Sequence, residues 1–182
     1  MKTLIGLFGF LFVVAIAVFI AGLLLPRDHV AVRSASLAAP PESVWTVVTQ
    51  VGRYPTWRRD VDSVQILETR GGRLEWREIS GGDRLRFEAV TAERPSRFVA
   101  RIADKGIPFG GSWDYRIVPE GSGSRLTITE NGQVYNPVFR FISQYFIGHT
   151  ATLDKYLGDI AAVVGGRDAP RGPNLPPLHG DS

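Results

Sequence analysis

The chain has 182 residues, of which 44% are hydrophobic and 21% are charged, and its net charge at pH 7 is +3. This length allows one folded domain beside an apolar N-terminus and a polar tail, but it is too short for two. Cysteine is absent, which excludes disulfides and thiolate metal sites. The small net charge, with no basic run longer than Arg58-Arg59, argues against nucleic-acid binding.

The N-terminal segment carries no charged residue from Thr3 to Leu25. A helix that crosses a bilayer needs about 20 apolar residues, whereas the apolar region of a secretory signal is shorter, roughly 7–15 residues. No clear Ala-x-Ala cleavage site follows the apolar run, and Leu23-Leu24-Leu25-Pro26 is too bulky for one. We therefore interpret residues 1–28 as an uncleaved transmembrane anchor, with a cleaved signal peptide as the alternative.

The charges that flank this segment bear on its orientation. Lys2 lies on its N-terminal side, and Arg27 and Arg33, partly offset by Asp28, lie on the other side. Cytoplasmic flanks carry the excess of positive charge in membrane proteins, and the short flank with Lys2 slightly favours an N-terminus inside. The sequence thus predicts a single-pass protein of a bacterial plasma (inner) membrane, with a slight preference for a domain on the outer, periplasmic side.

The soluble region begins with a strand and a short helix. Residues His29–Leu37 are rich in β-branched and small side chains and predict a strand. Pro40-Pro41-Glu42 then opens a helix, because proline suits the first turn and a carboxylate complements the positive end of the helix. Valines at helical spacing follow, and Gly52 ends this helix.

Six short runs of alternating apolar and polar residues fill the chain from Val61 to Val134 and are divided by turn residues. Even spacing and short turns predict consecutive hairpins, and hence an antiparallel sheet. One face of this sheet is charged, and the other is apolar and must be covered. The apolar face carries Leu74, Trp76, Leu85, Phe87, Ala89, Phe98, Ala100, Ile102, Trp113, Tyr115, Ile117, Leu126 and Ile128.

The cover for this face is predicted in the long run from Asn136-Pro137 to about Val164. Apolar residues recur there at the three-and-four spacing of an amphipathic helix, and Gly165-Gly166 follow. The folded domain is thus expected over residues 29–165, and the Pro- and Gly-rich residues 166–182 are expected to be disordered. The apolar stripe comprises Phe139, Ile142, Phe146, His149, Leu153, Tyr156 and Ile160.

Two segments resemble a known superfamily. They are APPESVWTVVTQVGRYPTWRRDV (Ala39–Val61), with a Pro-led helix and a Tyr-Pro-x-Trp turn, and ENGQVYNPVFRFISQYFIGHTATLDKYL (Glu130–Leu157), a last strand that runs into a helix. With the element order, they resemble the START-like (SRPBCC) superfamily of polyketide cyclase/dehydrase and lipid transport proteins, over roughly His29 to Val164. The resemblance implies an α+β helix-grip fold, in which a curved antiparallel sheet grips a long C-terminal helix. In this chain one predicted transmembrane helix precedes the helix-grip domain.

The resemblance also implies a deep apolar pocket for a lipid, sterol, polyketide or other hydrophobic molecule, and no metal or nucleotide cofactor. Large side chains of the sheet face and of the helix stripe are expected either to line this pocket or simply to fill the core. The predicted ligand-binding residues are Trp57, Trp76, Phe87, Trp113, Tyr115, Ile128, Glu130, Phe146 and His149.

Three polar residues on the apolar surfaces are candidates for chemistry. Glu78 and Glu130 share the inward parity of their strands, and because an unpaired buried carboxylate is costly, each is expected to pair with a base, bind a ligand or lie near the open end. His149 lies on the helix stripe, where an imidazole can act as a general base. Arg140 and His149 are the candidate partners of Glu130. The alternative for all three candidates is a structural role, since no catalytic or metal-ligand motif accompanies them.

The sequence therefore predicts a non-catalytic, membrane-tethered domain that binds or transfers a hydrophobic small molecule or lipid. An enzyme of the cyclase or hydratase type, with Glu130, His149 or Glu78 as acid and base groups, is one alternative. An interaction module of a membrane complex is another. We expect no cofactor and no nucleic-acid partner.

Overall fold

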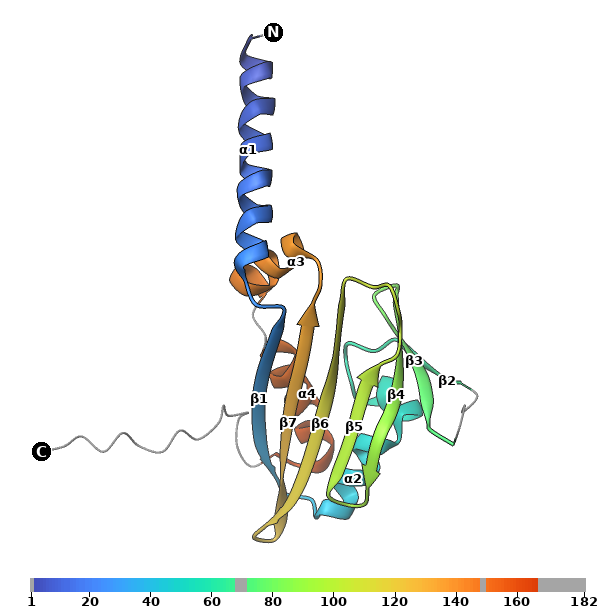
Figure 1. Cartoon of the computed structure of the whole chain (residues 1–182). Helices are drawn as coiled ribbons and strands as arrows, with labels where there is room; N and C mark the ends of the chain where they lie inside the picture. Colours follow the sequence, from blue (N-terminus) through green and yellow to red (C-terminus); the bar gives the residue numbers. More distant parts are fainter. Residues whose placement is uncertain (1, 68–71, 148–149, 167–182) are drawn as a thin grey trace, which may run out of the picture.

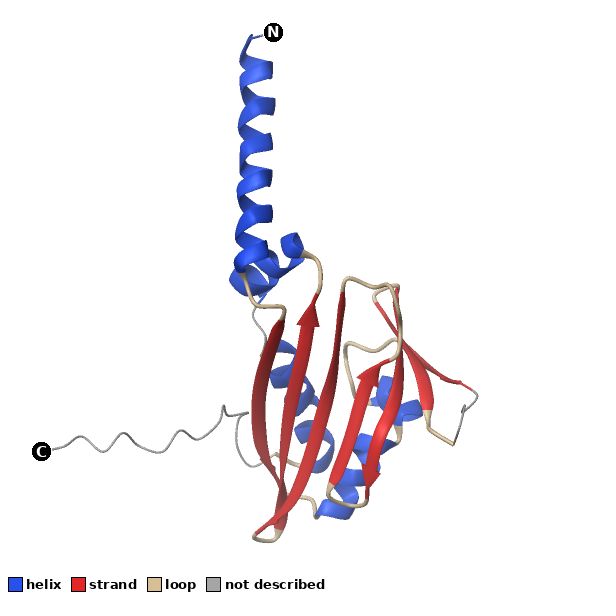
Figure 2. Ribbon diagram, viewed as in Figure 1, coloured by secondary structure: helices blue, strands red, loops and turns tan. Residues whose placement is uncertain are grey.

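The computed structural model describes residues 2–67, 72–147 and 150–166. A long helix projects from a domain that consists of one sheet with helices on one of its faces (Figure 1, Figure 2). The candidate residue His149 and the predicted disordered tail from residue 167 onward lie outside the described residues.

The elements follow the predicted order. The first four are α1 (Lys2–Leu24), β1 (Asp28–Leu37), α2 (Pro41–Thr49) and the 3-10 helix η1 (Val51–Thr56). Six strands come next: β2 (Ser63–Leu67), β3 (Glu75–Ser80), β4 (Asp83–Glu93), β5 (Arg97–Ile102), β6 (Phe109–Glu120) and β7 (Gly123–Val134). The last elements are α3 (Pro137–Ile142), the π-helical turn η2 (Ser143–Ile147) and α4 (Ala151–Val164).

The seven strands form one antiparallel sheet in the order β1-β7-β6-β5-β4-β3-β2. Strands β2 to β7 are consecutive hairpins, as their short turns predict. The first strand pairs with the last, from Asp28 opposite Gln133 to Leu37 opposite Ser124. This pairing brings the start of the domain, the end of β7 and the foot of α1 to one end of the sheet (Figure 1).

The core lies between the predicted apolar face of the sheet and the helices α2 and α4, which cover it (Figure 2). The sheet contributes Phe98, Ile117 and Ile128, whose alternation with polar residues directs them to one side. Helix α4 contributes Leu153, Leu157 and Ile160 at helical spacing, and α2 contributes Val44 and Val48; all are almost fully buried. The predicted α+β helix-grip arrangement is thus confirmed.

The opposite face of the sheet carries the charges that alternation assigned to it. Ion pairs cross between neighbouring strands: Arg86 with Glu75 at 2.5 Å, Arg101 with Glu88, and Arg97 with Asp114 at 2.9 Å. The arginines of these pairs reach water while Glu75 and Asp114 are largely covered, and surface ion pairs contribute about 0–1 kcal/mol each. Their main consequence is a soluble, charged outer face rather than added stability.

The C-terminal helix differs from the prediction, which extended it without a break from Pro137 to about Val164. The helix divides into α3 and α4, with the π-helical turn η2 after α3. Only α4 grips the sheet. Phe139 and Ile142, predicted to face the sheet, belong to α3 and are 36% and 39% exposed.

Contacts with α1 account for this break. The Asn136 side chain caps α3 by accepting a hydrogen bond from Phe139 N at 3.0 Å. Arg140 is buried and donates from Nη1 to the Leu25 carbonyl at 2.8 Å. Gly22 packs so tightly on α3 that a Cβ there would lie 1.9 Å from the Pro137 carbonyl oxygen. Helix α3 therefore lies against the foot of α1, away from the line of α4 (Figure 1).

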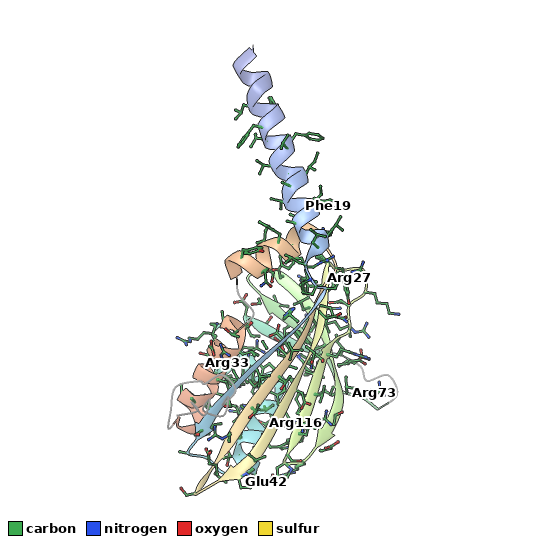
Figure 3. The ribbon with its side chains drawn as sticks, turned by 60° about the vertical axis from the view of Figure 1, so that its left-hand side comes forward. Phe19, Arg27, Arg33, Glu42, Arg73 and Arg116 are labelled. Carbon is green, nitrogen blue, oxygen red and sulfur yellow. The ribbon has the colours of Figure 1, made fainter. Side chains whose placement is uncertain are left out.

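Helix α1 contains a segment, Gly6–Leu24, that is long and apolar enough to cross a membrane. It lies near the N-terminus, where a signal sequence meets the same criteria. Its side chains, such as Phe19, project outward, and Arg27 marks the point where α1 gives way to β1 (Figure 3). The segment is therefore a candidate membrane span by its length and composition.

Candidate ligand pocket

The first part of the site is a cavity of about 80 Å³ between the middle of the sheet and α4, which we call the inner chamber. Aromatic and aliphatic side chains make up most of its wall. Five of the predicted ligand-binding residues line it, together with the candidate Glu78 and with further residues of η1, the loop after η1, β5 and α4. They are Trp76, Phe87, Trp113, Tyr115 and Ile128, and in addition Tyr54, Arg58, Asp60, Glu78, Ala100, Thr152, Leu153 and Tyr156.

A second cavity of about 270 Å³, the outer chamber, lies nearer to α1. Trp113 and Thr152 line both chambers, so the two adjoin. Ligand pockets have volumes of about 300–1,000 Å³, and the two chambers together reach the lower end of this range. The other residues of the outer chamber are His29, Leu85, Ile102, Phe109, Gly110, Glu130, Gly132, Gln133, Val134, Phe139 and Ser143.

The floor of the inner chamber is built around Arg58, which follows the Tyr-Pro-x-Trp turn. Its guanidinium donates to Glu78 Oε2 at 3.0 Å and to Asp60 Oδ2 at 2.8 Å. Trp76 Nε1 donates to the other oxygen of Glu78 at 2.9 Å. Glu78 therefore faces inward and pairs with a base, as its parity and the cost of burying a carboxylate suggested.

Two aromatic rings enclose the same guanidinium. Its central carbon lies 4.9 Å from the centroid of the Tyr54 ring and 5.3 Å from that of Tyr156, within the range of cation–π attraction. Burial disfavours the charge of Arg58, but the adjacent Glu78 and Asp60 more than offset it and hold the pKa of Arg58 above its ordinary value. Two carboxylates thus balance the charge of this cation, although its buried Nε has no hydrogen-bond partner among the described residues.

Three tyrosines bring hydroxyl groups to this region. Burial, followed by the neighbouring Tyr and Glu78 side chains, raises the pKa values of Tyr54, Tyr115 and Tyr156, so all three stay neutral. The Tyr54 hydroxyl donates to the Val48 carbonyl at 2.7 Å. The Tyr156 hydroxyl is buried close to those of Tyr54 and Tyr115, but it has no partner that meets hydrogen-bond geometry among the described residues. Because an unsatisfied buried polar group is costly, this hydroxyl is a natural contact for a polar atom of a ligand.

Glu130 forms a separate polar group in the outer chamber. Its Oε2 accepts a hydrogen bond from Trp113 Nε1 at 3.0 Å, and its Oε1 lies 3.4 Å from His29 Nε2. The imidazole lies over Gly132, where a Cβ would come within 2.1 Å of His29 Cε1. Glycine at this position therefore lets His29 reach the carboxylate.

The structure shows a contact of Glu130 with His29 that we did not expect, and it tests only one of the two candidate partners. Arg140 is directed elsewhere, because its guanidinium binds the Leu25 and Tyr135 carbonyls at the foot of α1. His149 lies outside the described residues. His29 takes the position because β1 pairs with β7, which joins two residues 101 positions apart in the chain.

The remaining predicted site residues do not come together in one place. Trp57 lines neither chamber; its ring packs edge-on against Tyr54 and Tyr156, at centroid distances of 5.5 Å and 5.2 Å, and supports the floor from behind. Phe146 belongs to η2, and its side chain is not described. Glu78 and Glu130 lie in different chambers, so they do not form a carboxylate pair.

Sequence reasoning missed Arg58, His29 and the Tyr156 hydroxyl. The signal for Arg58 is its place directly after the Tyr-Pro-x-Trp turn, opposite an inward carboxylate. The signal for His29 is its parity with Ala31, Ala35 and Leu37 on the buried side of β1. Across the described ranges, no group of three or more His, Asp or Glu side chains is placed to hold a metal ion.

The sheet, the gripping helix and the apolar recess between them define the class of START-like (SRPBCC) domains. Residues 28–164 match the family described as polyketide cyclase / dehydrase and lipid transport, and the chain belongs to this family. The family indicates a fold that binds hydrophobic ligands. A search of curated proteins found no match.

Solved structures with similar folds include a protein described only by its superfamily and several enzymes. A START superfamily protein from Mycobacterium smegmatis is 18% identical, with a TM-score of 0.59 over 75% of this chain and 97% of that one. Norcoclaurine synthase from Thalictrum flavum is 13% identical, with a TM-score of 0.60 over 80% and 90%. The Zhui aromatase/cyclase from Streptomyces sp. R1128 is 18% identical, with a TM-score of 0.50 over 59% and 68%. At these identities the similarity establishes the fold.

Proposed function

We propose that this protein binds or transfers a hydrophobic small molecule or lipid at a bacterial plasma (inner) membrane, with α1 as a single-pass tether and the domain on the outer, periplasmic side. The observation that carries the proposal is the pair of adjoining chambers between the sheet and α4. A tether holds this recess next to the bilayer, where apolar molecules are concentrated.

The lining of the chambers defines the chemistry of the ligand. Stacked aromatic side chains such as Trp76 and Phe87, whose ring centroids are 5.6 Å apart, suit a flat or extended apolar body. The free Tyr156 hydroxyl suits a neutral oxygen or nitrogen atom at the inner end of the ligand. Because Arg58 is already neutralised, a ligand with a buried anionic group fits less well. We therefore propose an uncharged amphiphile of drug-like size.

A bulky substitution that blocks the junction of the two chambers tests this function. Thr152 lines both chambers and is exposed on its outer side, so Thr152→Trp fills the junction with little strain on the core. Ala151→Trp is the matched control, because Ala151 is exposed and lines neither chamber. The full chain is purified from membranes in detergent, and bound organic molecules are extracted and quantified. We expect one enriched compound in the wild type and in Ala151→Trp, and a large loss in Thr152→Trp. Equal amounts in all three samples would contradict the proposal.

A second candidate function is an acid–base reaction of the cyclase or hydratase type. The observation that favours it is the Glu130–His29 contact at 3.4 Å in the outer chamber. The other walls of this chamber are largely apolar, as in a ligand site. A carboxylate beside an imidazole can move a proton to or from a bound molecule. If this function holds, Glu130→Gln keeps the extracted compound bound but abolishes its conversion over time, as measured by mass spectrometry. Unchanged compound in the wild type leaves binding alone as the function.

A further inference from the structure

We infer that α3 and the start of η2 lie in the boundary layer of a lipid bilayer, so that the outer chamber opens onto the membrane. This inference rests on the proposed role of α1 as a membrane tether. The lipid-contacting surface, which we call the interfacial platform, consists of Val138, Phe139, Ile142 and Tyr145. A ligand then passes between the bilayer and the pocket without crossing water.

The first argument is the depth of α3 relative to α1. The apolar span ends at Leu24. Gly22, two residues before this end, is in contact with Pro137 at the start of α3, and Arg140 binds the carbonyl of Leu25 just beyond the span. Since a helix rises 1.5 Å per residue, a position two residues from the end lies about 3 Å inside it. Helix α3 therefore begins at the level where the span meets the headgroups.

The second argument is the apolar surface that α3 leaves uncovered. The exposed fractions of the four platform residues range from 36% for Phe139 to 64% for Tyr145. Leu23 and Leu24 on the last turn of α1 are also exposed, at 53% and 83%. Figure 1 shows α3 directly beside this last turn, so exposed apolar residues are present on both helices where they meet. Exposed apolar residues that gather in this way mark a membrane or protein contact.

The third argument is the chemistry at the rim of the platform. Arg27 is exposed at the foot of α1, and Lys105 is exposed on the loop between β5 and β6. Lys105 and Tyr135 line a surface depression that also holds Arg101 and the carboxylates of Asp28 and Asp104. Basic side chains pair with lipid phosphates, and tyrosines such as Tyr135 and Tyr145 favour the headgroup level. This arrangement fits a lipid surface better than it fits a protein partner.

The fourth argument connects the platform to the pocket. Phe139 and Ser143 line the outer chamber, and the Phe139 ring packs against Phe109 with a centroid distance of 6.2 Å. The same short helix thus forms one wall of the chamber and part of the surface beside the span. A bilayer that covers the platform also covers the mouth of the chamber.

Single cysteines test this geometry cleanly, because the protein has none of its own. The full chain is reconstituted into vesicles of phosphatidylethanolamine and phosphatidylglycerol, and an environment-sensitive dye is attached at Ile142→Cys. Val118→Cys is the control on an exposed apolar residue near the far end of the sheet. Val14→Cys, in the middle of α1, reports on the tether itself.

Quenching by spin-labelled lipids and by aqueous iodide gives distinct outcomes. We expect shallow lipid labels to quench the dye at Ile142→Cys about threefold or more strongly than at Val118→Cys, with the reverse order for iodide. If Val14→Cys is quenched by deep lipid labels but Ile142→Cys behaves like Val118→Cys, the tether stands and the inference is overturned. If Ile142→Cys is shielded from both quenchers, a second copy covers the platform and the inference is overturned. If Val14→Cys is not quenched by lipid, the tether and the inference both fail.

Discussion

Tyr156 places a hydroxyl group in the inner chamber without a hydrogen-bond partner in the described part of the chain. Tyr54, whose ring also contacts the Arg58 guanidinium, has its hydroxyl satisfied by the Val48 carbonyl. The two side chains have the same chemistry and similar burial. They differ in that the Tyr54 hydroxyl completes a hydrogen bond of the fold, whereas the Tyr156 hydroxyl is available to the ligand that we propose.

This difference predicts opposite results for the same substitution. Tyr156→Phe removes an unsatisfied buried group, so the free energy of unfolding stays the same or rises slightly, while affinity for the bound ligand falls about 2- to 10-fold. Tyr54→Phe removes the hydrogen-bond donor of the Val48 carbonyl and lowers the free energy of unfolding by about 1–3 kcal/mol. Thermal melting and ligand titration of both variants check this. Equal destabilisation by the two substitutions would contradict the assignment of Tyr156 to the ligand.

Asp60 predicts a specific response to acid. Partial burial disfavours its carboxylate, but the hydrogen bond from Arg58, the charge of Arg58 and that of Lys155 outweigh this and lower the pKa of Asp60 below its ordinary value of 3.8. A lowered pKa in the folded state contributes stability that is present above the unfolded pKa and is lost as the pH falls through the folded one. Wild type should therefore melt at a higher temperature than Asp60→Asn near pH 7, and the gap should close below about pH 4. A gap that stays constant down to pH 2 would argue against an ionised Asp60 in the folded state.

At this scale the sequence predicted which side chains face inward but not all of their partners. Strand alternation and the cost of a buried carboxylate were enough to predict that Glu78 faces inward and pairs with a base. His29 was not predicted as a partner of Glu130, because it reaches this carboxylate only when β1 lies beside β7. Hairpin patterns report pairs of neighbouring strands, and they do not report which strand the first one joins.

The break between α3 and α4 belongs to the scale of elements. Apolar residues continue at helical spacing through this region, so the local pattern favours one helix. The path of α3 is instead determined by distant contacts with the Gly22 backbone and the Leu25 carbonyl. Local periodicity cannot contain this information, since the partner is more than 100 residues away in the chain.

A bulky residue at Gly22 should separate the two helices. Gly22→Leu collides with the Pro137 carbonyl, so we expect faster amide hydrogen exchange in α3 and little change in the sheet. Gly6→Leu is the matched control, because a Cβ at Gly6 has no atom within 4 Å. Hydrogen exchange followed by mass spectrometry of the full chain measures both. Unchanged exchange of α3 in Gly22→Leu would show that the contact does not hold α3 in place.

At the scale of the whole molecule, the sequence predicted the fold class, the seven strands and the covering helix from periodicity and turn residues. It also predicted that the space between sheet and helix is not completely filled, on the strength of the family resemblance. That space is divided into two chambers whose shared lining residues are Trp113 and Thr152. Such packing is a property of the assembled fold and leaves no pattern in the chain.

The central claim is that a hydrophobic molecule occupies the recess between the sheet and α4. The most direct test is a native mass spectrum of the wild-type full chain, released gently from the membranes in which it was made. We predict a species heavier than the bare chain by one constant mass, which disappears after Thr152→Trp and remains after Ala151→Trp. A spectrum that contains the bare chain alone, under conditions that preserve other protein–lipid complexes, would contradict the claim.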